Sequence, residues 1–328
     1  MWACSEKRCD MDTLTKKPMS KFAHKRLRWK NTPMTDKVTI IVIYVIISLV
    51  ILMCAYPLYL TIIASISDPY AVYSGKVNLL PKGFTIDSYK LVFTNKMIWR
   101  GYANTIFYTV AGTAFNLLLT IPSAYALSKK RLYGRGIITT IFLITMYFGG
   151  GMIPTYLLYK NLGLVDTRWI LIINGGLSVY NMIVTRTYFQ NNIPETLMEA
   201  ARIDGASEFR IFFRIVLSLS APIIAVITLY YAVGHWGSYF SAMIYTYDQK
   251  LQPLQLVLRN ILIMNESAYK DALESGDAEL IANASRQAYL ALTMKYSLVF
   301  IASAPMLVAY PFVQKYFVKG VMVGSLKG

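Results

Sequence analysis

The sequence has few of the residues that build disulfide frameworks, metal centres and charged surfaces. It holds three cysteines and two histidines in 328 residues, and only 15% of its residues are charged. Soluble domains usually carry about 25% charged residues. The positions of Cys4, Cys9 and Cys54 suggest no disulfide framework, and no Cys or His spacing fits a metal site. These shortages argue against a soluble domain and against a metal-binding one.

A nucleotide-binding loop is also missing, because no G-x-x-x-x-G-K-[ST] pattern occurs. The glycines at 149–151 do not qualify, since they lie in an apolar segment. His24 lies in a basic stretch, and His235 beside Trp236 is typical of an interfacial or packing residue. We therefore expect no catalytic residue, no metal and no cofactor bound by this chain, which is not predicted to be an enzyme.

Long apolar runs dominate what is present. Hydrophobic residues make up 55% of the chain, and a helix needs about 20 of them to cross a hydrocarbon core about 30 Å thick. The predicted spans are residues 38–63, 104–127, 137–158, 169–189, 215–233 and 292–313. We predict an all-α membrane protein with six transmembrane helices. It divides into a basic N-terminal segment (1–37), a transmembrane domain (38–313) and a C-terminal tail (314–328).

Basic residues cluster in particular links. Lys and Arg outnumber Asp and Glu by ten to four in 1–37, by four to none in 128–136 and by three to none in 314–328. Segment 235–291 has four basic and six acidic residues, whereas loop 64–103, with five and two, fits the pattern less well. The positive-inside rule places both termini in the cytoplasm. The membrane topology and the attraction to anionic lipid therefore explain the net charge of +16, and no nucleic-acid partner is needed to account for it.

Polar and helix-breaking residues interrupt several predicted spans. Gly112, Asn116 and Pro122 in the second span should face protein or water, because unsatisfied backbone and polar groups are costly in lipid. The glycines at 149–151 predict either a break in the third span or its end. The insertion 248–291 predicts an amphipathic helix, which would serve as a connector or as a docking surface for a soluble partner.

A polar segment, EAARIDGASEFR (199–210), lies between the fourth and fifth predicted spans. Pro194 suits the first turn of a helix, and Gly205 supplies the left-handed conformation that commonly ends one. Ser207 can cap a second helix. Leu197, Ala200, Ala201 and Asp204 are expected on one face, with the two alanines at its centre, where they would let a partner approach closely. We predict a helix, a sharp turn and a second helix that continues into the fifth span.

Around this segment the chain resembles a known family. EAARIDGA followed by FFRIVLSLSAP resembles the conserved cytoplasmic loop of permease subunits of ATP-binding-cassette importers, of the binding-protein-dependent carbohydrate (maltose-type) class. The resemblance continues through IPTYLLYKNLGLVDTRW (153–169), AVGHW (232–236) and YPFVQKYFVKGVMVGSLKG (310–328). Where the family often has proline, this chain has Ser218, which predicts a less kinked start of the fifth span.

The resemblance implies that the segment forms a cytoplasmic coupling helix, seated in a cleft of an ATPase subunit. The coupling residues that it implies are Glu199, Ala200, Ala201, Arg202, Asp204, Gly205 and Ala206. It also implies that Lys319, Gly320, Gly324 and Lys327 contact the ATPase pair, although a frayed basic end is the alternative. ATP and Mg would then be bound by the partner subunits.

The same resemblance implies a subunit of the bacterial cell membrane that imports an oligosaccharide or other carbohydrate by alternating access. Its partners would be a second permease, two cytoplasmic ATPase subunits, an extracytoplasmic solute-binding protein and membrane lipid. Aromatic faces and neutral hydrogen-bonding groups commonly hold sugars, so the candidate pathway residues are Asn116, Asn174, Tyr180, Asn181, Tyr230, Trp236 and Tyr239. Each would also suit a membrane interface or a contact between helices.

Other functions remain as alternatives. An ion-driven carrier or channel for a small polar solute needs ionisable residues within its spans, and none is predicted at mid-depth. A membrane-embedded enzyme needs a catalytic group at membrane depth, and none stands out. An importer of a peptide or a polyol would share the features described above.

Overall fold

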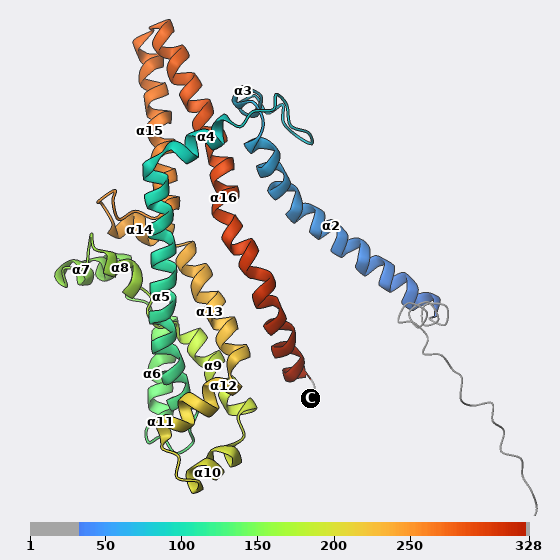
Figure 1. The fold of residues 1–328 in the computed structure, drawn as a ribbon, viewed down its shortest axis with the longest axis vertical. Coiled ribbons are helices and arrows are strands. Elements are labelled where there is room, and N and C mark those ends of the chain that lie inside the picture. The colour runs from blue at the N-terminus through green and yellow to red at the C-terminus, as the bar shows by residue number, and fades with distance from the viewer. Residues whose placement is uncertain (1–32, 326–328) are drawn as a thin grey trace, which may run out of the picture. The chain divides into compact units, whose positions relative to one another are not determined.

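The computed structural model describes residues 33–325, with side-chain surroundings as far as Val308 and at Pro311. Within these residues the regular structure is entirely helical, as predicted (Figure 1). The chain forms two structural units, residues 1–59 and 60–328. Helix α2 (Met34–Ser65) supplies the described part of the first unit. Its most apolar 18-residue window is wholly exposed, which suits a helix surrounded by lipid or by another subunit.

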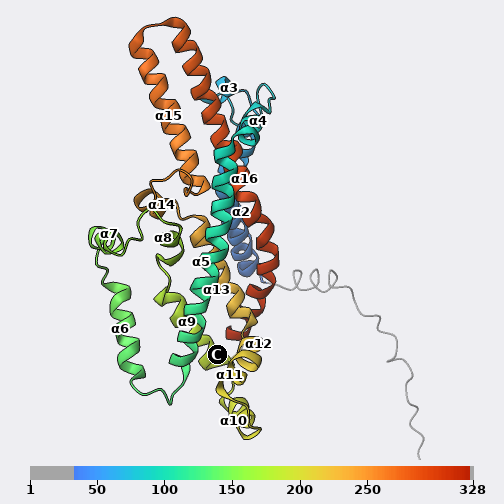
Figure 2. The ribbon, with the colours of Figure 1, turned by 60° about the vertical axis from the view of Figure 1, so that its left-hand side comes forward.

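Helix α5 (Lys96–Ser128) is the central column of the second unit. Its 33 residues span about 50 Å at about 1.5 Å per residue. Helices α9 (Val179–Asn192) and α13 (Ala221–Trp236) pack against α5, and so does α15 (Leu254–Ser275) nearer its first residue (Figures 1 and 2). The column contributes Leu127, Tyr108 and Ile98 to three separate apolar clusters.

A polar stripe runs along the buried face of α5. Its members recur every three or four residues and are Thr105, Thr109, Thr113, Asn116 and Thr120. This spacing is that of one helix face. The prediction is therefore confirmed for Gly112 and Asn116, which are buried against protein, whereas Pro122 is exposed.

Within residues 33–325, three helices are long and apolar enough to cross a membrane, namely α2, α5 and the part of α16 (Ala278–Ser325) that ends at Val308. Two bent pairs would raise the number to five. The first joins α6 (Arg135–Tyr147) to α7 (Met152–Asn161) at 111°, with the glycines 149–151 at the bend. The second joins Glu208–Leu219 to α13 at 80°.

The predicted fourth span, 169–189, is not one continuous helix. It consists of α8 (Arg168–Ile173) and α9, which are separated by residues 174–178. The asparagine and two glycines that begin this stretch interrupt the backbone ladder, so the segment forms a broken helix.

The remaining helices are short, apart from one hairpin. They are α3 (Pro69–Tyr73), α4 (Asp87–Thr94), α10 (Glu195–Ile203), α11 (Glu208–Arg210), the π-helix η2 (Ile211–Val216), α12 (Leu217–Leu219) and α14 (Tyr239–Tyr245). Helices α15 and α16 form the hairpin, which confirms the helix predicted within 248–291. The hairpin and α10 lie at opposite ends of the α5 column (Figures 1 and 2).

Candidate functional site

The polar segment folds as a short helix, α10, closed by a tight turn. The N–H of Gly205 donates to the carbonyl of Arg202 (3.0 Å), and the N–H of Ala206 donates to the carbonyl of Ala201 (2.9 Å). These two bonds form a Schellman motif, which satisfies the last carbonyls of a helix. It requires a left-handed residue, and Gly205 has φ +75°. The predicted helix and its glycine turn are therefore confirmed, while their coupling role stays a prediction.

An ion pair joins the two sides of this turn. The Nε of Arg202 donates to Oε1 of Glu208 at 2.6 Å. This hydrogen bond is the main reason why the pKa of the Glu208 carboxyl is lowered, and the charges of Lys129 and Arg131 act in the same direction. The same contact raises the pKa of Arg202. The pair tethers α11 to α10 across the turn.

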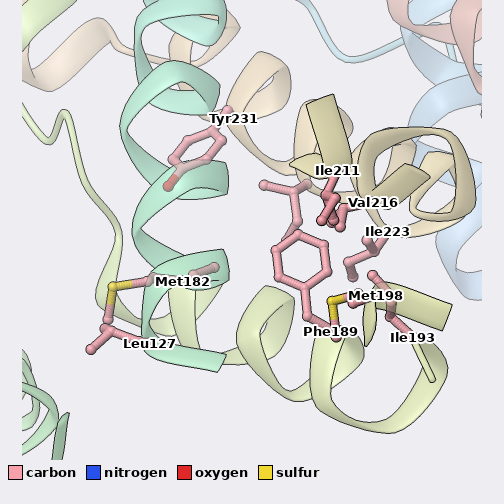
Figure 3. Packing of buried hydrophobic residues seen from close by; sticks show 11 residues of the cluster. Leu127, Met182, Phe189, Ile193, Met198, Ile211, Val216, Ile223 and Tyr231 are labelled. Carbon is pink, nitrogen blue, oxygen red and sulfur yellow. The ribbon is translucent and has the colours of Figure 1, made fainter. Parts of the chain in front are cut away.

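The inward side of α10 is anchored in an apolar cluster at one end of α5 (Figure 3). Met198 of α10 is buried there, together with Leu127, Met182, Phe189, Ile193, Ile211, Val216, Ile223 and Tyr231. The Nζ of Lys129 lies 2.6 Å from the Met198 sulfur and 4.2 Å from the centre of the Tyr125 ring. Burial lowers the pKa of Lys129. A displacement of α10 would therefore reach α5, α9 and α13 through packed side chains.

The outward side of α10 is exposed. Glu199, Ala200 and Asp204 face away from the cluster, and Ile203 is 87% exposed. Of the predicted face, Leu197, Ala200 and Asp204 are exposed, whereas Ala201 is half-buried and packs against the cluster. Successive residues are about 100° apart at about 3.6 residues per turn, so the two alanines divide between the two sides. Ile203 was absent from the predicted set, although a large apolar residue within a charged motif was a signal for it.

The helix after the turn is strongly bent where it meets α13. The segment passes through η2 and α12 and then turns by 80° at Ser220. The prediction of a less kinked start, based on Ser218, is wrong. Pro222 lies in the first turn of α13, four residues after Ser218, and lacks the N–H that would donate to the Ser218 carbonyl. This missing hydrogen bond accounts for the kink.

A pocket of about 350 Å³ lies between α5, the α8–α9 break and α13. In its wall, Asn116 Nδ2 donates to the carbonyls of Gly175 (3.0 Å) and Gly176 (2.8 Å). Its Oδ1 lies 2.6 Å from His235 Nε2. Because the amide nitrogen is committed to carbonyls, Oδ1 is the acceptor and His235 Nε2 carries the proton. A Cβ at Gly112 would overlap the His235 ring, so the close approach requires glycine there.

Side chains from other helices satisfy the backbone and the polar groups of the α8–α9 break. The N–H of Ser178 donates to the hydroxyl of Tyr231 (3.1 Å), which also bonds a threonine of α5. The Tyr159 hydroxyl donates to Asn174 Oδ1 (3.2 Å), and Asn174 Nδ2 donates to Ser241 Oγ (3.1 Å). Broken helices are tolerated at membrane depth when their free groups are satisfied in this way, and in transporters they line binding sites.

Three of the predicted pathway residues line this pocket, namely Asn116, Asn174 and Tyr230. The other four, Tyr180, Asn181, Trp236 and Tyr239, do not belong to its lining. Trp236 instead donates its Nε1–H to the carbonyl of Ala302 (3.1 Å), so it joins α13 to α16.

His235 is the functional candidate that sequence reasoning missed. It was predicted near the outer end of the fifth span as an interfacial or packing residue, and its buried ring, packed on Gly112, confirms the packing role. Helix α13 ends at Trp236, and the buried His235 ring meets Asn116 near the middle of the predicted span 104–127. Gly112 and Asn116, four residues apart on one face of α5, were a signal for a bulky polar neighbour.

The predicted C-terminal contact residues cannot be placed against a partner. Lys319, Gly320 and Gly324 belong to α16, in the part whose side-chain surroundings are not described, and Lys327 lies outside the described residues. Their contact with an ATPase stays a prediction. Across residues 33–325, no group of three His, Cys, Asp or Glu side chains is placed to hold a metal ion.

Comparisons with known proteins bear on the whole chain. The family model described as "Binding-protein-dependent transport system inner membrane component" matches residues 98–323. The polygalacturonan/rhamnogalacturonan transport system permease protein YtcP of Bacillus subtilis (strain 168) is 38% identical over 295 residues, which are 90% of this chain and 100% of that protein. The galactooligosaccharides transport system permease protein GanQ of the same organism is 29% identical over 292 residues, 87% of this chain and 94% of GanQ.

A solved structure agrees with these relatives. It is the crystal structure of a bacterial ABC transporter involved in the import of the acidic polysaccharide alginate. One of its chains matches with a TM-score of 0.76 and 34% sequence identity, over 87% of this chain and 99% of that one.

A helical chain that crosses the membrane several times and keeps a broken helix beside a buried pocket has the architecture of a transport subunit. This chain belongs to the family of binding-protein-dependent transport system inner membrane components. It is therefore a multi-pass membrane permease of the ATP-binding-cassette type, and its named relatives are permease subunits of sugar transport systems.

Proposed function

We propose that this chain is one permease subunit of an ATP-driven importer that moves an oligosaccharide by alternating access. The observation that carries the proposal is the family match over residues 98–323, which includes both α10 and the pocket. The relatives at 38% and 34% identity are named for polygalacturonan and for alginate, whereas GanQ at 29% is named for galactooligosaccharides. The solute proposed here is therefore an oligosaccharide that carries uronic acid residues.

The proposed topology has six spans with both termini in the cytoplasm, and α10 lies between spans four and five. Three long helices and two bent pairs support five crossings, and the broken α8–α9 segment supplies the sixth. The basic segment 1–37, the domain 38–313 and the tail 314–328 remain the proposed division. The basic link 128–136 lies at the same end of α5 as α10, as the positive-inside rule requires of a cytoplasmic end.

Helix α10 is proposed to be the coupling helix. Glu199, Ala200, Ile203 and Asp204 would face a cleft of the ATPase subunit, since they point away from the apolar cluster. Ala201, Gly205 and Ala206 would keep the shape of the turn, and the pair of Arg202 with Glu208 would keep it rigid. Met198 would pass the displacement to the bundle.

The energy for this displacement would come from the partners. Shifting a two-state equilibrium from 1:99 to 99:1 takes about 5.5 kcal/mol of differential binding, which is more than one nine-residue helix can supply. ATP and Mg would be held by two cytoplasmic ATPase subunits, and a second permease would complete the pathway. An extracytoplasmic solute-binding protein would deliver the saccharide. The C-terminal residues Lys319, Gly320, Gly324 and Lys327 are proposed as a further ATPase contact.

The pocket beside the α8–α9 break is proposed to be the part of the solute pathway that this chain supplies. Asn116, Asn174 and Tyr230 present an amide, a second amide and an aromatic hydroxyl to it, and His235 adds an imidazole. Its volume of about 350 Å³ suits a single sugar residue of a longer chain. Neutral hydrogen-bonding groups would let such a chain slide between sites.

Reconstitution of the importer tests the proposal. The chain would be purified with its native partners, placed in proteoliposomes and supplied with trigalacturonate and the solute-binding protein. We expect uptake that requires ATP, and ATP hydrolysis that the loaded binding protein stimulates. Because His235 is an ionisable group within a span, uptake that survives complete loss of the ATPase would instead favour an ion-driven carrier.

A further inference from the structure

A second cavity lies at the end of the bundle opposite α10, where the α15–α16 hairpin begins to project (Figures 1 and 2). It is a groove of about 520 Å³ between α3, α15 and α16. Tyr73, Asn265, Tyr269, Lys270, Tyr289 and Lys295 contribute to its lining. None of these residues belongs to the coupling helix or to the central pocket.

Tyrosine rings from three helices form one wall of this groove. The ring of Tyr289 on α16 lies 4.4 Å from that of Tyr73 on α3, centre to centre, at a tilt of 38°. Tyr70 packs edge-on against Tyr289 at 6.1 Å. Tyr289 is half-buried and Tyr73 is 55% exposed, so the cluster leaves ring surface open to a ligand. Ring faces attract the apolar C–H face of a pyranose by dispersion and weak C–H contacts.

Two lysines and Glu266 are the charged residues that line the groove. Lys270 is neutralised by Glu266, whose Oε1 lies 2.8 Å from its Nζ. Lys295 is exposed, and within the described part of the chain it has no acidic side chain within ion-pair distance. Lys295 therefore supplies a cation that a ligand carboxylate can approach. Asn265 Nδ2 donates to the Ile261 carbonyl (2.8 Å), so its Oδ1 and the tyrosine hydroxyls supply the neutral hydrogen bonds.

We propose that this groove is a binding subsite for a uronate-containing saccharide. One sugar ring stacks on Tyr289 and Tyr73, its hydroxyls bond to Asn265, and its carboxylate pairs with Lys295. The cavity is large enough for two sugar residues, since ligand pockets of this kind measure roughly 300–1,000 Å³. This inference rests on the proposed import of an acidic oligosaccharide, and it assigns a first binding position to the end of the chain opposite the ATPase side.

Binding to the intact chain in nanodiscs of phosphatidylcholine tests this subsite. The probe is trigalacturonate, and its fully methyl-esterified form serves as a neutral probe of the same shape. Tyr289→Ala should weaken trigalacturonate binding by about tenfold, as loss of about 1.4 kcal/mol of stacking would. Tyr289→Phe should bind as the unaltered chain does, because it keeps the ring face. Lys295→Gln should reduce the affinity for trigalacturonate to that for its ester.

Tyr133→Ala is the matched control, because Tyr133 is 99% exposed and lies in the link after α5. It should bind trigalacturonate like the unaltered chain. Equal affinity of the unaltered chain, Tyr289→Ala and Lys295→Gln for trigalacturonate would overturn the inference. Displacement of the probe by phosphatidylglycerol in the nanodisc would also overturn it, and would assign the groove to lipid headgroups.

The test separates this inference from the proposed function. If the groove variants bind normally while the assembled importer moves trigalacturonate, the subsite is wrong and the importer stands. If the assembled importer does not move trigalacturonate at all, the proposed solute is wrong whatever the groove binds.

Discussion

The turn at the end of α10 is stabilised by hydrogen bonds within its own backbone. The break between α8 and α9 is stabilised by side chains from other helices. The turn at Gly205 closes with hydrogen bonds to Arg202 and Ala201, both within α10. The break after α8 depends on Asn116 of α5 and Tyr231 of α13. One element is self-contained, and the other is shared by the bundle.

This difference suits two tasks. A self-contained turn keeps its shape when a partner displaces it, so α10 can move as one body. A break held by several helices must be rearranged when those helices move relative to one another, because its polar groups cannot stay unpaired at membrane depth. The comparison therefore predicts that damage to the break affects the whole fold, while damage to the turn affects coupling.

The largest effect is expected from Asn116→Leu. This variant leaves the carbonyls of Gly175 and Gly176 and the Nε2–H of His235 without their partner in a buried site. We expect the free energy of unfolding to fall by about 3 kcal/mol, since each unsatisfied group costs about 1–3 kcal/mol. Thermal unfolding in detergent measures it.

Asn192→Leu is the control for that variant, because among the described residues the Asn192 amide bonds only to the Tyr188 carbonyl of its own helix. It should change stability by less than about 1 kcal/mol. If the two variants unfold at the same temperature, the stability of the α8–α9 break does not depend on Asn116.

A large functional effect with a smaller structural one is expected from Gly205→Pro. Proline fixes φ near −65° and removes the N–H that bonds to Arg202, so the turn cannot form. The bundle should lose only about 1–2 kcal/mol of stability. ATP hydrolysis in the reconstituted importer should become at least about tenfold less dependent on loaded binding protein, as 1.4 kcal/mol of lost coupling would give. Normal coupling in this variant and in Asp204→Lys would refute the role of α10.

A change confined to the partner contact is expected from Ile203→Asp. The side chain is 87% exposed, so the stability of the isolated chain should change by less than about 0.5 kcal/mol. Association with the ATPase subunits, measured by co-purification from membranes, should weaken by about tenfold or more, because an apolar anchor is replaced by a charge. Met264→Asp, on the exposed surface of the hairpin at the other end, should leave association unchanged.

The smallest effect concerns the pH dependence of the turn. Because Arg202 lowers the pKa of Glu208 below its ordinary value of 4.5, their pair stabilises the turn above about pH 4.5. That contribution is lost as the pH falls through the lower, folded-state pKa. The side chain of Glu208 is 58% exposed, so the effect is at most about 1 kcal/mol.

Protection factors from hydrogen exchange of the amides at 205–208, compared between pH 6 and pH 3, measure this effect. Glu208→Gln should remove the pH dependence, whereas Glu266→Gln on the hairpin should leave it unchanged. A turn in Glu208→Gln that still loosens on acidification would show that another group is responsible.

The features of the fold that depend on neighbouring residues could be predicted from the sequence. The apolar runs predict helical spans because each run meets the bilayer's length requirement by itself. Gly205 predicts the turn because a left-handed helix end is a property of a few neighbouring residues. The α8–α9 break could not be located in the same way, since the side chains that stabilise it lie 53 and 59 residues away in the sequence.

The errors have the same origin. The contact of His235 with Asn116 was not predicted, because the two residues lie 119 positions apart in the sequence. The kink before α13 was underestimated because the prediction was based on Ser218, whereas Pro222 lies in the first turn of α13. The tyrosine groove was not predicted at all, because its rings come from three helices that only the fold brings together.

Helix α5 is one continuous helix that contributes residues to all three of the apolar clusters described above. Such a helix has no preferred direction of signalling. If nucleotide binding changes the affinity for saccharide by some factor, thermodynamic linkage requires that saccharide binding changes the affinity for nucleotide by the same factor. A solute bound near the first turns of α5 would therefore change the nucleotide affinity of the ATPase subunits before it had begun to cross the membrane.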